Sequence, residues 1–492
     1  MKKKLLLSAL IAGTLVLSGC NLLDRLTSLI PGDESSETSS QGGSSGGSSS
    51  SQPAGPSRPW TILIYMCGSN LESGNGYDGY NDPVNKPLGL ASEDISEILS
   101  VNGQPSNVNI VLECGGAEGW ANTQVKAHQD KLSRWTVENK KLVHQEDVNK
   151  VSMGLSTTLQ SFLEWGVQKY PSENIGLILW NHGGAMQGVC ADENYSNNYL
   201  MNSEVKSAVS GAMTTLGMTG QKFEFIAYDA CLMAVQDVAE FNSQYFKYML
   251  CSQETEAGEG YQYTSWLDDL YAGKDTETVL KAAAKGFVDA YESTYGSYYA
   301  NDQTQSVLDL SKMAAYKEAF EDFASSAGSC INSYNNGDKS KFRDYLKQNV
   351  KTYANDKIEM SELEYEAAQY GETVQETIAW YQDNYDIFDY DPVTNAYIYG
   401  YGCDYFGTFD VVDFLDEVGK LSAFSSLSGK ISAVKSALND LVIYKYNGDE
   451  AGASNGLCLF FSTSNRCYKS SVYTSSETNF TNWRTVVNTY GA

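Results

Sequence analysis

The stretch IGLILWNHGG, residues 175–184, is an apolar run that ends in a histidine followed by two glycines. A continuous apolar run of this length is typical of a strand buried on both faces. Similar runs recur along the chain: WTILIYM (60–66), VNIVLEC (108–114), FEFIAYDAC (223–231) and KYMLCSQE (247–254). Segments with helical spacing lie between them, such as the one around Leu159 and Phe162. Strands alternating with helices predict an α/β fold, with a largely parallel sheet covered by helices on both sides.

The pattern changes from Thr276 onward, where longer helical stretches are joined by two apolar runs, SVLDL (306–310) and GLCLFFS (456–462). We therefore divide the folded part into an α/β domain, residues 60–275, and a mixed α/β region, residues 276–492. Residues 385–405 are rich in Tyr and Asp, which predicts a surface loop or hairpin. The acidic DNYDIFDYD there offers oxygen ligands for calcium. Its spacing is not that of an EF-hand loop, and a solvated face is the favoured interpretation.

The first twenty residues, MKKKLLLSALIAGTLVLSGC, have the basic start and short apolar run of an export signal. The ending LSGC resembles the lipobox of bacterial lipoproteins, in which the cysteine, here Cys20, carries the lipid. An ordinary signal peptide is the alternative. We predict a signal peptide over residues 1–19 and a lipidated, Ser- and Gly-rich tether over residues 20–59. The protein is then exported and lipid-anchored to the outer face of a bacterial cell membrane.

The composition limits the classes of partner. The 492 residues include 34 basic and 61 acidic ones, which gives a formal net charge of −27. Binding to nucleic acid needs clustered Lys and Arg, so a nucleic-acid partner is excluded. The length exceeds one ordinary hydrophobic core and favours two domains or a large one with insertions.

The ten cysteines do not form a metal-binding or disulfide pattern. No two of them are two to four residues apart, and several lie within apolar runs, which favours buried free thiols. Cys231 differs because it ends an apolar run. The residues after it, including Leu232, Val235 and Val238, have helical spacing. We therefore expect Cys231 at a helix N-terminus, where free N–H groups and the helix dipole stabilise a thiolate.

The chain has three histidines, and only one of them follows an apolar run. His128 and His144 lie in polar surroundings and are interpreted as surface residues. His182 ends a predicted strand, as Cys231 does. Carboxyl ends of parallel strands meet at one sheet edge, so the two residues lie side by side if their strands are neighbours. Either residue alone is better explained as part of a strand end or core, but their joint placement favours a catalytic pair.

The motifs NHGG (181–184) and DACLM (229–233) resemble those of the clostripain-like cysteine peptidases, relatives of caspases, gingipains and legumains. Further landmarks of that family follow in order over roughly residues 60 to 465: WTILIYMCGSNLES, SQETEAGEGYQY, FDVVDFLDEV and NGLCLFFSTS. The resemblance implies a caspase-like three-layer α/β/α sandwich, with residues 60–275 as the catalytic domain and residues 276–492 completing the peptidase.

The resemblance also implies roles for individual residues. Cys231 is the nucleophile and His182 the general acid and base, with no obligatory third member. Backbone N–H groups of Gly183 and Cys231 form the oxyanion hole, a contribution of about 2.7–4 kcal/mol for each donor. No cofactor is implied, and the calcium dependence of some relatives cannot be read from the acidic loops. The expected partners are protein or peptide substrates. The chain contacts the membrane only through the lipid anchor, and we expect it to be a monomer.

The resemblance assigns Asp229 to the pocket for the residue before the cut, where it pairs with Arg or Lys. Gly260 and Tyr261 are expected to form walls of that pocket. An Asp that only fixes the turn after the strand is the alternative. Several relatives cut themselves after a basic residue between the two motifs, but this chain has none there before Lys206, which falls inside a predicted helix. Either no such cut is needed or the specificity is not for basic residues.

Two other functions are alternatives to a peptidase. A caspase-fold surface lipoprotein without catalysis could bind peptide or glycan through its Tyr-rich second region. A serine hydrolase is set aside because the sequence lacks a Gly-x-Ser-x-Gly nucleophile elbow. The sequence therefore predicts a surface-anchored cysteine endopeptidase that cuts after Arg or Lys, with the binding lipoprotein as the alternative.

Overall fold

The computed structural model describes residues 58–76, 82–296, 301–335, 337–384, 387–391, 396–400, 405–464, 467 and 473–491. The predicted signal peptide, Cys20 and nearly all of the predicted tether lie outside these residues. Among the residues described, no helix is both long and apolar enough to cross a membrane.

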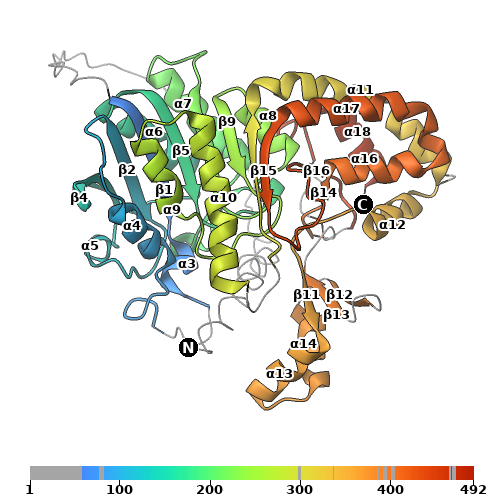
Figure 1. Cartoon of the computed structure of the whole chain (residues 1–492), viewed down its shortest axis with the longest axis horizontal. Coiled ribbons are helices and arrows are strands. Elements are labelled where there is room, and N and C mark those ends of the chain that lie inside the picture. The colour runs from blue at the N-terminus through green and yellow to red at the C-terminus, as the bar shows by residue number, and fades with distance from the viewer. Residues whose placement is uncertain are drawn as a thin grey trace, which may run out of the picture.

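A nine-stranded sheet forms the centre of the molecule (Figure 1). Five parallel strands make up its middle, and each of the five apolar runs predicted as strands forms one of them. Antiparallel strands extend the sheet at both edges. From edge to edge the strands are β15 (Val442–Asn447), β10 (Thr304–Asp309), β9 (Phe246–Cys251), β8 (Phe223–Asp229), β5 (Ser172–Trp180), β1 (Arg58–Cys67), β2 (Val108–Gly115), β3 (Leu132–Glu138) and β4 (Lys141–Val148).

Helices cover both faces of the sheet because its central strands are apolar on both sides. In β1, Leu63 and Tyr65 point into one core, whereas Ile62 and Ile64 point into the other. The first core is closed by α6 (Ser156–Lys169), α7 (Asn202–Thr215) and α8 (Gln236–Asn242). The second is closed by α4 (Leu90–Ser100), α9 (Tyr263–Tyr271) and α10 (Thr276–Tyr295). These layers confirm the predicted α/β/α architecture.

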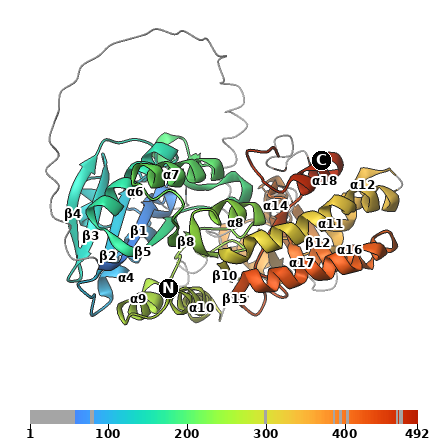
Figure 2. The same cartoon turned by 90° about the horizontal axis from the view of Figure 1, so that it is seen from above.

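The region after α10 both completes the sheet and extends the first core. Its strands β10 and β15 pair with each other, and β10 also pairs with β9. Its helices are α11 (Met313–Tyr334), α12 (Lys339–Asn349), α16 (Val411–Lys420), α17 (Ser428–Leu441) and α18 (Thr481–Tyr490), and its other strands include the pair β14 (Thr408–Asp410) and β16 (Cys458–Phe460). Helix α11 packs against α8, and Figure 2 shows α11 and α17 lying side by side.

A small subdomain projects from this region (Figure 1). It contains the strands β11 (Asn355–Glu359), β12 (Ile387–Asp391) and β13 (Ala396–Gly400), and the helices α13 (Met360–Tyr370) and α14 (Val374–Asn384). Strands β12 and β13 pair antiparallel, as a predicted hairpin over residues 385–405 requires. Residues 385–386, 392–395 and 401–404 of that segment lie outside the described residues.

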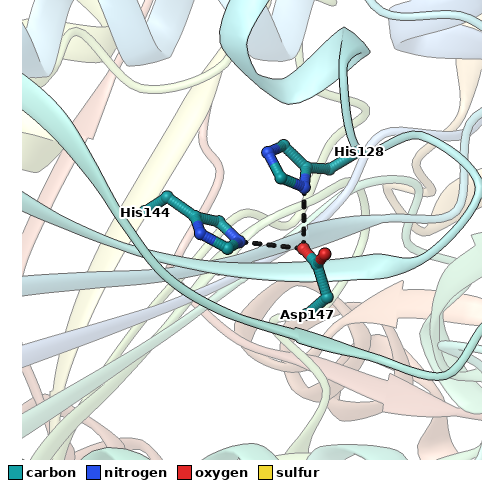
Figure 3. A group of neighbouring side chains, drawn as sticks. All are labelled: His128, His144 and Asp147. Carbon is teal, nitrogen blue, oxygen red and sulfur yellow. Dashed lines mark hydrogen bonds and ion pairs between the residues drawn. The ribbon is translucent and has the colours of Figure 1, made fainter.

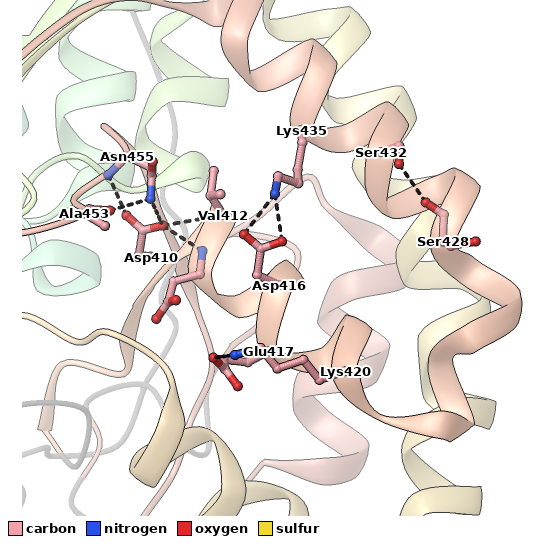
Figure 4. A network of polar contacts seen from close by, with 11 residues as sticks. Asp410, Val412, Asp416, Glu417, Lys420, Ser428, Ser432, Lys435, Ala453 and Asn455 are labelled. Carbon is pink, nitrogen blue, oxygen red and sulfur yellow. Dashed lines mark hydrogen bonds and ion pairs between the residues drawn. The ribbon is translucent and has the colours of Figure 1, made fainter.

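The side chain of Asp410 connects the C-terminal region to the centre of the molecule. Its Oδ1 caps α16 by accepting a hydrogen bond from the backbone N–H of Val412, and it accepts another from the side chain of Asn455 (Figure 4). Its Oδ2 accepts one from Nε2 of Gln253, at 3.0 Å. Gln253 lies in the loop 252–262, which follows β9. The buried Asp410 therefore fastens this loop to the C-terminal region.

Candidate active site

The pairing of β5 with β8 brings His182 and Cys231 together. Trp180, the last residue of β5, lies opposite Asp229, the last residue of β8. His182 and Cys231 each lie two residues further along neighbouring parallel strands, so they meet at the same edge of the sheet. The condition for the two residues to lie side by side, that their strands are neighbours, is therefore met. Both line one cavity, whose other lining residues are Leu71, Trp180, Asn181, Asp229, Ala230, Glu256, Ala257, Gly258 and Gly260.

The imidazole of His182 is buried and held by Asn70. Its Nε2 lies 2.7 Å from Oδ1 of the Asn70 side chain, and only 7% of the residue is exposed. An amide oxygen only accepts hydrogen bonds, so Nε2 carries the proton and Nδ1 keeps a lone pair. Burial lowers the pKa of His182 to about 4. The ring is therefore neutral at physiological pH and can accept a proton at Nδ1.

Asn70 is a residue of this site that the sequence analysis missed. It lies in the short helix α3 (Ser69–Ser73), which follows β1, and β1 pairs with β5. The end of β1 is thus at the same sheet edge as His182. The sequence signal was a polar residue four positions after the apolar run 60–66, within the landmark WTILIYMCGSNLES.

The expected placement of Cys231 at a helix N-terminus is wrong. Helix α8 begins only at Gln236, five residues later. The intervening segment runs beside the loop after β9: the N–H of Leu232 donates to the carbonyl of Glu254, and that of Ala234 donates to the carbonyl of Ser252. Leu232 also has a φ of 66°, which no helix contains. Tertiary pairing therefore overrides the helical spacing of the apolar residues.

The thiol of Cys231 is neutral in this structure. Its Sγ accepts a hydrogen bond of 3.2 Å from the backbone N–H of Glu256. Burial, followed by the charge of Glu256, raises the pKa of Cys231 to about 12. The site thus pairs a neutral thiol with a neutral imidazole, rather than a thiolate with an imidazolium.

Gly183 lies against the backbone of Cys231. A Cβ atom at position 183 would lie 2.1 Å from the carbonyl oxygen of Cys231, which is closer than two non-bonded atoms can approach. Only glycine fits at this position. The two residues expected to supply the oxyanion-hole N–H groups are therefore in direct contact.

Asp229 is a buried carboxyl group at the cavity. It is 3% exposed, and it accepts hydrogen bonds of 3.0 Å from the N–H of Tyr261 and from the hydroxyl of Tyr263. Burial is the main cause that raises its pKa, to about 7. No Lys or Arg of the described residues lies within 4.0 Å of it. A cation that enters this cavity would meet a carboxyl group without a counter-ion.

Gly260 lies in the wall of the cavity, as expected, but Tyr261 is not among the residues that line it. Gly260 lines the cavity with a φ of 64°, and a Cβ there would lie 2.7 Å from Oδ1 of Asp229. Tyr261 contributes its backbone N–H, while its hydroxyl donates to the carbonyl of Tyr228 and its ring packs in the core. A second carboxyl group, that of Glu256, also belongs to the cavity, and burial raises its pKa well above the ordinary value.

The segment between the two motifs is folded into the core beside the site. It contains the strands β6 (Val189–Asp192) and β7 (Asn198–Leu200), and residues 185–192 are buried. The side chain of Asn181 fastens it, donating to the carbonyl of Cys67 and accepting from the N–H of Ala191. Lys206 lies inside α7, as expected.

Comparison with known proteins places the chain in a family. The model of the clostripain family of peptidases matches residues 80–487. Clostripain of Hathewaya histolytica is 22% identical over 454 residues, which cover 81% of this chain and 76% of that protein. An inactive zymogen C11 protease from Parabacteroides distasonis has a similar fold, with a TM-score of 0.51 and 17% identity over 89% of this chain and 98% of that one.

A secreted C11 cysteine protease from Bacteroides thetaiotaomicron, solved with an irreversible peptide inhibitor, is also similar. Its TM-score is 0.50 at 15% identity, and the match covers 88% of this chain and 98% of that one. Both structures show likeness of fold, which is that of the caspase-like cysteine peptidases. The match of the family model over most of the chain identifies it more closely: the chain belongs to the clostripain family, and it is a cysteine endopeptidase.

Cys231 should be the first of the described cysteines to react with iodoacetamide. Seven of the described cysteines form no disulfide, which confirms for them the interpretation as free thiols, and all seven except Cys231 are buried: Cys67, Cys114, Cys190, Cys231, Cys251, Cys330 and Cys458. Because the thiolate is the reacting form and the pKa of Cys231 is raised, the rate should still increase with pH above about 9. Mass spectrometry of peptides from a time course measures this. Faster labelling of Cys330 or Cys67, or a plateau near pH 8, would contradict the burial described.

Proposed function

We propose that Cys231 and His182 are the catalytic pair of this endopeptidase. The observation that carries the proposal is the register of β5 and β8, which brings the two residues to one cavity. Sγ of Cys231 attacks the scissile carbonyl carbon while its proton passes to Nδ1 of His182. Backbone N–H groups of Gly183 and Cys231 stabilise the oxyanion. His182 then protonates the leaving amine, and water hydrolyses the thioester.

The reaction starts from a neutral pair. Burial keeps the pKa of His182 low and that of Cys231 high, so a proton moves between them only when the substrate carbonyl is in place. The imidazolium that then forms donates from Nε2 to Oδ1 of Asn70. This hydrogen bond becomes charge-assisted and therefore stronger in the transition state. We assign Asn70 as a positioning residue that fixes the tautomer and orientation of His182.

The residue before the cut is Arg or Lys in this proposal. Asp229 lies in the cavity with no cationic partner among the described residues, and Glu256 adds a second buried carboxyl group. A guanidinium or ammonium group that enters the cavity would favour the ionised form of Asp229 and give this carboxylate a counter-ion. A neutral side chain would leave it protonated, without that gain.

We also propose that the enzyme is exported and works as a monomer at the outer face of a bacterial membrane, held by the lipid on Cys20. The lipobox-like LSGC and the Ser- and Gly-rich residues after it support this. The secreted relative from Bacteroides thetaiotaomicron supports export. The substrates are proteins or peptides, and the proposed steps use only Cys231, His182, backbone amides and water.

Cleavage of fluorogenic peptides tests the activity directly. A panel with Arg, Lys, Asn, Asp or Leu before the bond should show turnover after Arg and Lys, with and without a chelator. Cys231→Ala should abolish turnover because no nucleophile remains, whereas the melting temperature should stay close to that of the parent. Wild-type turnover by Cys231→Ala would exclude the mechanism. An inert parent whose Cys231 is intact would favour a binding protein.

Asn70→Ala should lower kcat about 10²-fold and change KM little, because the imidazole loses its orienting acceptor. Asn70→Asp keeps an acceptor and adds a negative charge. It should retain more activity and move the acid limb of the pH profile upward, since the charge raises the pKa of His182. The readouts are kcat, KM and pH profiles with an arginyl peptide. An unchanged kcat in Asn70→Ala, with an unchanged pH profile in Asn70→Asp, would remove Asn70 from the mechanism.

Asp229 should impose a pH dependence on arginyl substrates only. Its ionised form binds the cation, so kcat/KM should rise with pH through about 7 and then level off. In Asp229→Asn that limb should disappear, and kcat/KM for Arg should fall about 10²–10³-fold. Hydrolysis after Leu, measured in parallel, should hardly change. An equal loss on Arg and Leu peptides would mean that Asp229 only shapes the turn.

A further inference from the structure

Two of the three histidines meet one carboxylate on the far edge of the sheet (Figure 3). Nδ1 of His128 and Nε2 of His144 each lie 2.8 Å from the same oxygen, Oδ1 of Asp147. His128 lies in the turn between α5 (Thr123–Lys126) and β3, whereas His144 and Asp147 lie on β4. The three donor atoms are all within 4.8 Å of one another. Their surface placement was expected, but their convergence was not.

The two imidazoles are held in place by packing. Their rings stack with centroids 4.3 Å apart and an angle of 17° between the planes. Each ring also meets the buried Trp135 edge-on, at 5.3 Å for His128 and 4.9 Å for His144. Trp135 lies directly opposite His144 in the pairing of β3 with β4. An indole that is only 2% exposed therefore fixes both rings before any ligand arrives.

We propose that His128, His144 and Asp147 form a zinc site, with water as the fourth ligand. Two imidazole nitrogens and one carboxylate oxygen are a donor set that Zn²⁺ takes up, whereas Ca²⁺ and Mg²⁺ require oxygen ligands. On binding, the proton that each ring directs at Asp147 moves to the other ring nitrogen, which leaves a lone pair for the ion. Because no thiolate takes part, the affinity is that of an exchangeable site.

The charges around the site are compatible with a cation. Lys131 contacts the other carboxylate oxygen, Oδ2, at 3.3 Å, and leaves Oδ1 to the ion. Nearly half of the Lys131 side chain is exposed, so it can move into solvent when the ion binds. The formal charge of −27 over the whole chain draws cations toward the surface.

The ion would fasten the outermost strand of the sheet. Strand β4 is at the edge and pairs only with β3 within the described sheet. Zinc would join β4 to the turn that precedes β3 and stabilise the folded state by mass action. None of the three ligands lines the active-site cavity, so the expected effect is on stability rather than on turnover.

Zinc titration of the full chain tests the site. A Cys231→Ala background prevents binding at the catalytic thiol. Calorimetry near pH 7.5 should find one ion per chain, and zinc should raise the melting temperature. In His128→Gln/His144→Gln the affinity should fall at least about tenfold and the thermal shift should vanish. Lys141→Gln, on the same strand but away from the ligands, should bind zinc as the parent does.

The outcomes separate the proposal from its alternatives. Unchanged zinc affinity in the double variant, or no saturable binding by the parent at micromolar zinc, would overturn it. A stoichiometry of one ion for two chains would overturn it as well, because the three ligands belong to one chain. If the double variant does not fold, Asp147→Asn, which keeps the size of the side chain, provides the same comparison. The His-to-Gln pair should leave peptide hydrolysis by the otherwise native chain unchanged.

Discussion

The parallel pairing of β5 with β8 is the constraint on which the site depends. Once Trp180 lies opposite Asp229, the two residues after each strand are placed next to each other. A slip of one residue would exchange the faces of a strand whose residues are buried on both sides. Gly176 helps to hold the register, because the ring of Phe225 on β8 occupies the space where a Cβ would lie, 2.3 Å from its nearest atom. Packing in the middle of the sheet thus determines chemistry at its edge.

Burial sets the protonation of the whole cavity. The low pKa of His182 and the raised pKa values of Cys231, Asp229 and Glu256 all have desolvation as their first cause. The resting site therefore carries less charge than its residue types imply. In the proposed mechanism, charges arise when a substrate binds: a cationic side chain ionises Asp229, and a correctly placed carbonyl allows proton transfer from Cys231. Binding energy is in this way linked to the chemical step.

The central strands were predictable because each is apolar on both faces and gives a continuous run. The flanking strand β4 was not, since its inward and outward residues are mostly polar and partly exposed. The helical spacing after Cys231 predicted a helix that does not start there, because hydrogen bonds to the loop after β9 determine the backbone conformation of that segment. The sequence predicted that His182 and Cys231 lie side by side if their strands are neighbours, and the pairing of β5 with β8 supplies that order. The contacts of Asn70 with His182, and of His128 with Asp147, depend on side-chain directions that no sequence period encodes.

The strand β15 has a consequence for the order in which the molecule is made. It is contributed by residues 442–447, yet it pairs with β10, more than a hundred residues earlier, as the outermost strand on one side of the sheet. Asp410 and Asn455 brace the loop of Glu256 from the same late part of the chain. The sheet and that loop therefore cannot be complete until residues 442–455 have been synthesised. A nascent chain that already carries both His182 and Cys231 thus still lacks the strand and the brace that complete the structure around them.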